Sequence, residues 1–199
     1  MSWQVDYAHT GIHFSVRHMM IATVRGEFQK FQVETTLNDS HIEKLRADYI
    51  LTEQDFLDSH LTVEIETASI NTRDADRDKH LRSADFFDAA NYPHIKFQAT
   101  RGEQIDDNHG KLYGDLTIRD VTKPVVLEVE HIGQAQSPWG TRNAGFSARA
   151  KINRKDWNLN WNVALETGGW LVSDEIKIEI DIEFTQTQAQ PAEQLTAVA

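Results

Sequence analysis

Residues 176–184 read Ile176-Lys177-Ile178-Glu179-Ile180-Asp181-Ile182-Glu183-Phe184, so apolar and charged side chains alternate without exception. Successive side chains of a β-strand point to opposite faces, and the alternation therefore predicts a strand with one buried face and one solvated face. Strands with this pattern are typical of antiparallel sheets, which pack one side on a core and leave the other in water.

The same period of two recurs along most of the chain, in runs that are mostly joined by short turns containing Gly, Asn or Asp. The further runs lie at residues 12–16, 24–28, 31–37, 61–65, 95–99, 112–118, 125–129 and 146–152. A break that resembles a β-bulge separates the second and third of them. About eight strands without βαβ units predict an all-β fold, either an antiparallel sandwich or a barrel.

One or two short helices are expected beside the strands. Asn71-Thr72 provides an N-cap and is followed by Asp74, Asp76 and Asp78, so the pattern predicts a helix from Thr72 to about Ala90. A second helical or irregular stretch is expected between residues 40 and 59. The tail, residues 185–199, is rich in Gln, Ala and Thr and is predicted to be disordered.

Composition excludes several classes of protein. The chain has 199 residues and no cysteine, which allows one well-packed domain and excludes disulfides, thiolate nucleophiles and cysteine-ligated metals. A net charge of −11 argues against nucleic-acid binding. The first residues contain no basic and apolar leader pattern, and no apolar run approaches the roughly 20 residues that span a bilayer. We therefore expect a cytoplasmic protein that does not span a membrane.

Motifs for catalysis or metal binding are not found. His9 and His13 share a strand face, but four residues along a strand separate them by about 13 Å, too far for one ion. The hydrolase signatures GxSxG and SxxK are absent, and so are phosphate-binding loops. We predict no catalytic residue, no metal site and no required cofactor.

Tryptophans are concentrated in one region, because four of the five lie between positions 139 and 170. Two interpretations are open: a Trp-rich core under one end of a barrel, or an aromatic lining for an apolar ligand, which an eight-stranded barrel can hold. Small residues on apolar faces, among them Ala99, Gly114, Ala148 and Ala150, favour the second interpretation slightly, although a bulky neighbour could fill the space they leave.

Several segments resemble the YceI-like, polyisoprenoid-binding proteins. In the family's order they are residues 6–18, 71–88, 92–97, 114–125 and 146–156, and the similarity extends from about Trp3 to Phe184. The resemblance implies a lipocalin-like, extended eight-stranded antiparallel β-barrel over residues 1–184, whose lumen holds a long isoprenoid or similar lipid. It also implies a tendency to form homodimers.

Strand parity, together with this resemblance, selects the residues expected to face the lumen, with the two tryptophans near one end. They are Phe14, His18, Phe28, Phe97, Leu116, Leu127, Val129, Phe146, Ala148, Trp157, Trp161 and Ile178.

The polar residues of the family motifs are His9, His18, Arg77, His80 and Arg154, which either orient a ligand headgroup or stabilise the fold. We favour a structural role for Arg77, His80 and Arg154, because buried polar groups need partners with or without a ligand. His18 shares an apolar face with Ile12 and Phe14 and is the better lumen candidate.

We therefore predict a binding protein and not an enzyme. It would bind and sequester or carry a long apolar lipid, above all a polyisoprenoid such as an isoprenoid quinone or a polyprenyl chain. One alternative is an enzyme or redox accessory that acts on a quinone or tetrapyrrole in the same pocket. Another is a protein–protein interaction module with a fully packed barrel.

Overall fold

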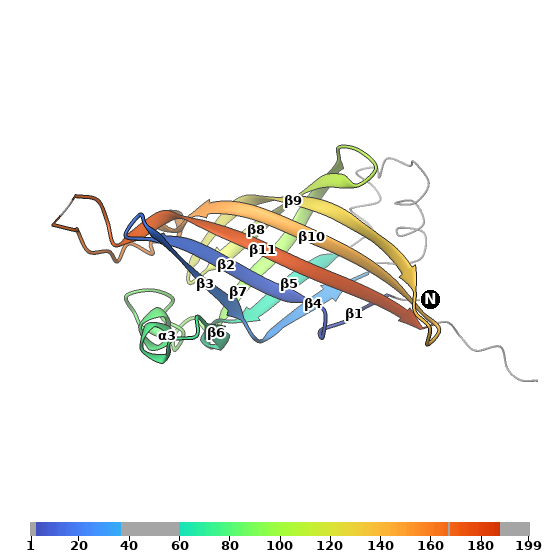
Figure 1. Ribbon diagram of the computed structural model, residues 1–199, viewed down its shortest axis with the longest axis horizontal. Coiled ribbons are helices and arrows are strands. Elements are labelled where there is room, and N and C mark those ends of the chain that lie inside the picture. The colour runs from blue at the N-terminus through green and yellow to red at the C-terminus, as the bar shows by residue number, and fades with distance from the viewer. Residues whose placement is uncertain (1–2, 37–59, 167, 188–199) are drawn as a thin grey trace, which may run out of the picture.

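A computed structural model describes residues 3–36, 60–166 and 168–187. Within these ranges, strands form one 11-stranded antiparallel sheet that curls into an elongated barrel (Figure 1). The predicted all-β, lipocalin-like class is confirmed.

The strands and short helices follow the predicted runs closely. They are β1 (Gln4–Val5), β2 (Gly11–His18), β3 (Ala22–Phe28), β4 (Phe31–Thr35), β5 (Leu61–Glu66), the 3-10 turn η1 (Thr67–Ser69), β6 (Ile70–Asn71), α3 (Ala75–Arg82), β7 (His94–Gln104), β8 (His109–Ile118), β9 (Val121–Gln136), β10 (Thr141–Asn153), the 3-10 turn η2 (Arg154–Trp157) and β11 (Val172–Thr187).

The strand order is β4-β5-β7-β8-β9-β10-β11-β2-β3-β6, with β1 on β11. β3 and β4 are separated only by Gln29 and Lys30, yet β3 pairs with β2 whereas β4 pairs with β5. Phe28 pairs with Ile12 on one side and with Ile70 on the other, so the two ends of the sheet meet along this bent segment. With β3–β4 and β5–β6 each taken as one bent strand and β1 set aside, the eight expected strands are recovered.

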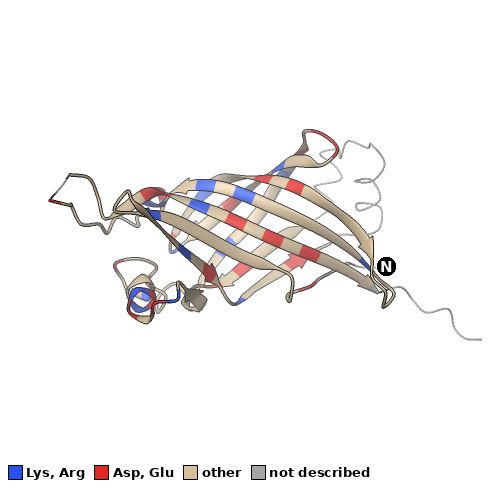
Figure 2. Ribbon diagram, viewed as in Figure 1, with Lys and Arg blue, Asp and Glu red and all other residues tan. Residues whose placement is uncertain are grey.

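The alternating stretch at residues 176–184 lies in β11, in the middle of the sheet. Its register with β10 runs from Thr141↔Thr187 to Asn153↔Glu175. Lys177 and Glu179 are exposed, whereas Ile178 and Ile180 face inward. Figure 2 shows charged residues at intervals along the strands. The predicted assignment of the two faces is confirmed.

Helix α3 is shorter than predicted. It covers Ala75–Arg82, and its N-cap is Asp74, whose side chain accepts a hydrogen bond from the Arg77 backbone N–H. The helix ends at Ser83, whose backbone is extended, so the predicted range from Thr72 to Ala90 was wrong at both ends. The second predicted stretch, residues 40–59, lies outside the described residues. Among the helices in the described part, none combines the length and apolar character needed to cross a bilayer.

The predicted boundary between barrel and tail needs correction. Strand β11 continues through Thr187, because β10 begins at Thr141 and offers backbone partners to this extension. Gln186 is only 2% exposed. The first residues of the predicted disordered tail therefore belong to the barrel, and residues 188–199 lie outside the described residues.

Candidate functional site

The barrel encloses a cavity of about 740 Å³, which is lined by residues of β2 to β5, β7 to β11 and α3. Its walls are the apolar faces that strand parity predicts. The volume falls within the roughly 300–1,000 Å³ typical of small-molecule sites. A cavity of this size argues against the fully packed barrel of an interaction module.

Most of the predicted lumen residues do line this cavity. They are Phe14, His18, Phe28, Phe97, Leu116, Leu127, Val129, Phe146, Ala148, Trp161 and Ile178. Trp157 does not: it is 2% exposed, and its indole N–H donates to the Leu116 carbonyl at 3.1 Å within the core. The strand parity ends at η2, and Asn158 turns the chain with a left-handed φ of 59°. Trp157 therefore belongs to a packed core, whereas Trp161 belongs to the aromatic lining of the cavity.

The small residues on the inner face also divide into two groups. A Cβ atom at Gly114 would lie 2.4 Å from the Phe97 ring, so that ring already fills the space beside this glycine. Ala99, Ala148 and Ala150, in contrast, line the cavity directly. The cavity therefore depends on the alanines, and the glycine allows an aromatic ring to pack closely.

Helix α3, Arg154 of η2 and Trp161 line one part of the cavity, which we call the α3 end. Figure 1 shows α3 beside one end of the barrel. Arg77 donates from Nε to the Thr72 hydroxyl at 2.7 Å and from a terminal nitrogen to the Thr72 carbonyl at 2.9 Å. Asp78, which is buried, accepts from the Thr72 backbone N–H at 2.8 Å and from its hydroxyl. These bonds attach the start of α3 to the segment that follows β6.

Arg154 is the most deeply buried cation at the α3 end, with 3% of its surface exposed. Its guanidinium donates to the carbonyls of Ser173, Leu159 and Trp161 and to the Asp174 carboxylate. Burial lowers the pKa of this guanidinium, and the neighbouring Asp174 opposes that shift. The arginine holds η2 and the loop after it against β11, which is a structural role.

His80 lies at the same end and is likewise partnered. Its Nε2 is 2.9 Å from the Asp85 carboxylate, and its ring packs edge-on against Trp161 at a centroid distance of 4.6 Å. His18, the better lumen candidate by sequence, lines the cavity from the end of β2. Arg77, His80 and Arg154 thus have protein partners, as the structural interpretation predicts.

The opposite end contains a residue that sequence reasoning missed. His131 on β9 lines the cavity, and its ring packs against Phe146 at a centroid distance of 5.1 Å. Beyond Phe146 lies a small core cluster of Trp3, Ala144 and Phe184. We call this region the His131 end. The signal in the sequence is parity, because His131 continues the inward series of Leu127 and Val129.

The His131 ring has an unusual environment for a polar group. Its Nε2 atom is buried and has no hydrogen-bond partner within the described part of the chain. Burial lowers the pKa of His131, while a backbone hydrogen bond to Gly133 opposes the shift. The His131 side chain thus lines the cavity, whereas its Nε2 atom is covered by neighbouring protein atoms.

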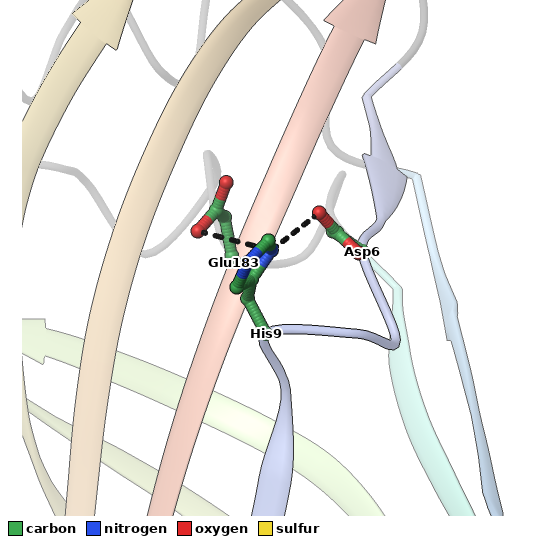
Figure 3. Close-up of side chains that lie close together, drawn as sticks. All are labelled: Asp6, His9 and Glu183. Carbon is green, nitrogen blue, oxygen red and sulfur yellow. Dashed lines mark hydrogen bonds and ion pairs between the residues drawn. The ribbon is translucent and has the colours of Figure 1, made fainter.

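A second group of polar side chains lies outside the cavity: Asp6 and His9 on the segment before β2, and Glu183 on β11 (Figure 3). His9 Nδ1 is 2.8 Å from a carboxylate oxygen of Asp6 and 3.9 Å from one of Glu183. Each of the three residues has one atom that could coordinate a metal ion, and these atoms lie within 4.8 Å of one another. The hydrogen bond that the Asp6 carboxylate accepts from His9 raises the pKa of His9 and lowers the pKa of Asp6. Asn143 also donates to Glu183, so these side chains already have partners that join the N-terminal segment to β11 and β10. The spacing would suit a cation, but the bonds present give the group a structural role.

Comparison with known proteins gives one family. Residues 3–184 match the YceI-like domain. The protein YceI of Escherichia coli O157:H7 is 35% identical over 182 residues, which cover 89% of this chain and 82% of that protein. The crystal structure of the Campylobacter jejuni YCEI protein has a TM-score of 0.68 at 31% identity and covers 86% of this chain and 90% of that one.

A more distant structure shares the fold alone. It is described as a polyisoprenoid binding domain from Saccharophagus degradans and has a TM-score of 0.58 at 12% identity. The likeness covers 92% of this chain and 98% of that domain.

Proposed function

The chain belongs to the YceI-like family, and we propose that it binds a long apolar lipid, above all a polyisoprenoid, inside the barrel cavity. The observation that carries this proposal is the cavity, whose walls are apolar side chains from almost every strand. The polyisoprenoid binding domain of Saccharophagus degradans, which has the same fold, supports the choice of ligand class.

Burial of the chain is sufficient to explain tight binding. A drug-sized ligand gains about −0.3 kcal/mol per non-hydrogen atom, so a lipid of ~40 carbons would reach about −12 kcal/mol, which corresponds to a nanomolar Kd. No covalent step is needed. The mechanism is sequestration, in which the barrel removes the apolar chain from water so that it can be stored or carried.

The arrangement of polar groups favours binding over catalysis. At the α3 end, Arg77 and Arg154 are hydrogen-bonded to backbone carbonyls and a hydroxyl of the protein, which supports a structural role for both. The cytoplasmic location and the homodimer stay predictions. A coloured or redox-active purified protein would instead favour the alternative of an accessory that acts on a quinone or tetrapyrrole.

The test enlarges Ala148, which is buried on β10 between Val129 on β9 and Ile180 on β11. We expect Ala148→Phe to keep a near-native melting temperature, because the added ring enters the cavity and not a packed core. We also expect the variant to lose uptake of a long-chain isoprenoid. Mass spectrometry of organic extracts from the purified wild type identifies the natural ligand.

Arg149→Phe is the matched control, because it adds the same ring at the next position on the outer face. It should bind as the wild type does. The proposal fails if Ala148→Phe unfolds the protein, or if the wild type contains no lipid and takes none up.

A further inference from the structure

Exposed apolar side chains are concentrated on two neighbouring loops at the α3 end. Among the described residues, ten large apolar side chains are exposed, and five of them lie on these loops. Met19, Met20 and Ile21 form the turn between β2 and β3, and Val163 and Trp170 lie on the loop before β11. We call these five residues the apolar tip. Figure 1 shows the loop before β11 projecting beyond the barrel at the end where β2 and β3 are joined.

The backbone of Leu171 holds the two loops together. Its N–H donates to the Val163 carbonyl at 2.9 Å, and its carbonyl accepts from the Met19 N–H at 2.8 Å. The Asn162 side chain donates to the Val172 carbonyl at 2.7 Å and accepts from the Val172 N–H at 3.0 Å. Leu171 and Val172 both line the cavity. The apolar tip therefore has a defined backbone structure and adjoins the α3 end of the cavity.

The two loops are almost without charge in a chain of which 26% is charged. Residues 18–24 contain no Asp, Glu, Lys or Arg, and residues 157–172 contain Glu166 alone. Moving a charge from water into an apolar medium is costly, so a surface that lacks charges is suited to enter such a medium. The absence of charge thus distinguishes this end from the outer face of the strands.

A row of cations crosses the outer face of the sheet behind the apolar tip. Lys151 on β10 pairs with Lys177 on β11, Lys177 pairs with Ser15 on β2, and Ser15 pairs with Arg25 on β3. We call Lys151, Lys177 and Arg25 the basic row, and Figure 2 shows blue segments on neighbouring strands toward this end. Within the part of the chain that the structure describes, none of the three forms an ion pair. Like charges directly opposite each other are destabilising, and an anionic partner would relieve the repulsion.

We propose that the apolar tip inserts into the surface of a lipid bilayer that contains anionic lipids, with the basic row over the headgroups. The α3 end of the cavity then faces the bilayer. The docking surface itself goes beyond the proposed function, but the choice of a bilayer rests in part on that function. A long apolar lipid resides in membranes and must leave them to enter the cavity.

The spacing between the apolar tip and the basic row fits a bilayer surface. Ser15 precedes Met19 by four residues on β2 and the turn after it, so the row lies at most about 13 Å behind the tip. Interfacial segments bury their apolar face about 5–10 Å deep, at the boundary of headgroups and acyl chains. At that depth the basic row lies within about one Debye length of the lipid phosphates, where each Lys or Arg strengthens binding about fivefold.

A protein partner fits the apolar tip less well. A stable protein interface takes roughly 20–30 residues from each side, whereas the tip consists of a few side chains on two projecting loops. Trp170 also favours a bilayer, because tryptophan combines an apolar ring with a polar N–H and is enriched at membrane–water interfaces.

The first experiment measures co-sedimentation of the full chain with vesicles of phosphatidylglycerol and phosphatidylcholine in equal parts. The variants Met20→Asn/Ile21→Ser and Trp170→Ser should each bind at least about tenfold more weakly than the wild type, because burying one large apolar side chain is worth that factor. Asn is chosen at position 20 because Met20 has a left-handed φ of 63°, which Asn tolerates.

Trp139→Ser is the matched control. Trp139 is 89% exposed, more than Trp170, but it lies on the turn between β9 and β10 at the opposite end of the barrel. This variant should bind vesicles as the wild type does. If Trp139→Ser and Trp170→Ser weaken binding equally, the barrel adheres to vesicles without using the tip, and the inference is overturned.

Brominated lipids provide a second measurement, which needs only conservative variants that keep the fold. They should quench part of the tryptophan fluorescence of the wild type and of Trp139→Phe. That part should disappear in Trp170→Phe. Quenching that survives in Trp170→Phe would place another tryptophan in the bilayer and would contradict the proposed orientation.

The basic row is tested with the variant Arg25→Gln/Lys177→Gln. We expect binding to the mixed vesicles to weaken by about 25-fold, and binding to pure phosphatidylcholine vesicles to change little. Lys111→Gln is the control, because Lys111 pairs with Glu103 near the turn between β7 and β8, at the opposite end of the sheet. An equal loss on both kinds of vesicle would show that the row does not bind anionic headgroups.

Docking and lipid uptake are measured separately, so their failures differ. A wild type that takes up a long-chain isoprenoid from detergent but binds no vesicles overturns this inference and leaves the proposed function intact. Vesicle binding without any uptake contradicts the proposed function alone. Sedimentation without vesicles tests a second copy of the chain as the occupant. A dimer that Trp170→Ser dissociates would assign the apolar tip to that copy and overturn the bilayer.

Discussion

The polar side chains at the two ends of the cavity differ in whether the protein satisfies their hydrogen bonds. At the α3 end, Arg77, His80 and Arg154 are bonded to carbonyls, a hydroxyl and carboxylates of the protein. At the His131 end, Nε2 is buried and unbonded within the described residues. The difference shows that a polar side chain beside the cavity can serve the fold alone, and that its hydrogen-bond partners show whether it does.

The comparison gives a general expectation for substitutions. Removing a polar group that the protein already satisfies leaves its partners without bonds, and stability falls. Removing a buried group that has no hydrogen-bond partner leaves the protein as stable as before or more so. Substitutions at the two ends should therefore change the free energy of unfolding in opposite directions.

The largest loss of stability is expected for Arg154→Met. The substitution leaves the carbonyls of Ser173, Leu159 and Trp161 without the donor that the buried Arg154 provides, and breaking a buried charged network costs about 3–5 kcal/mol. Urea denaturation measures the change. Lys155→Met is the control, because Lys155 forms only a partly exposed ion pair with Asp174, worth at most about 1 kcal/mol. Similar losses for the two variants would contradict the structural role of Arg154.

A smaller loss is expected for Asp78→Ala, also at the α3 end. Asp78 accepts from the backbone and hydroxyl of the buried Thr72, so its removal should cost about 1–3 kcal/mol. Thermal denaturation with and without lipid would show the change in both states. Asp76→Ala, at an exposed site in the same helical turn, should cost no more than about 0.5 kcal/mol. If the two aspartates proved equivalent, the bonds to Thr72 would not hold this end together.

Sequence reasoning predicted the walls of the cavity better than its ends. Period two assigns Phe97, Leu116 and Ile178 to the inner face because a long strand keeps its parity from end to end. It fails for Trp157, where the 3-10 turn η2 interrupts the strand. Helix α3 was predicted too long because the sequence does not show that Ser83 adopts an extended backbone.

His131 illustrates a different limit. Parity alone would place it inside the barrel, next in the series after Leu127 and Val129. Whether a buried nitrogen has a partner depends on atoms far away in the sequence, on β10 and in the turn after β7. The sequence therefore predicts where His131 points, and the fold is needed to show that its Nε2 is free.

His131→Phe should raise the stability of the protein, in contrast to the losses expected for Arg154→Met and Asp78→Ala. Replacing a buried, unbonded nitrogen by carbon should stabilise the lipid-free protein by about 1 kcal/mol, because the desolvation cost of Nε2 disappears. The same substitution at the other end, His80→Phe, removes the bond to Asp85 and should lower stability. Melting temperatures of both variants, measured after delipidation, test this. A loss in both cases would mean that His131 has a partner of its own.

The smallest expected effect comes from the titration of His131. Burial lowers its pKa below the ordinary value of 6.5. As the pH falls below about 6.5, the unfolded chain therefore binds a proton while the folded ring stays neutral, and the free energy of unfolding decreases until the pH reaches the folded pKa. Above about 6.5 both states are neutral, and this contribution does not change.

His131→Phe has no such titration, so its stability advantage over the wild type should widen as the pH falls from about 7.5 to 5. Chemical denaturation of the two lipid-free proteins at several pH values measures this difference, in which the titrations of the other groups largely cancel. A difference that narrows on acidification would mean that the folded ring takes up the proton more readily than the unfolded chain.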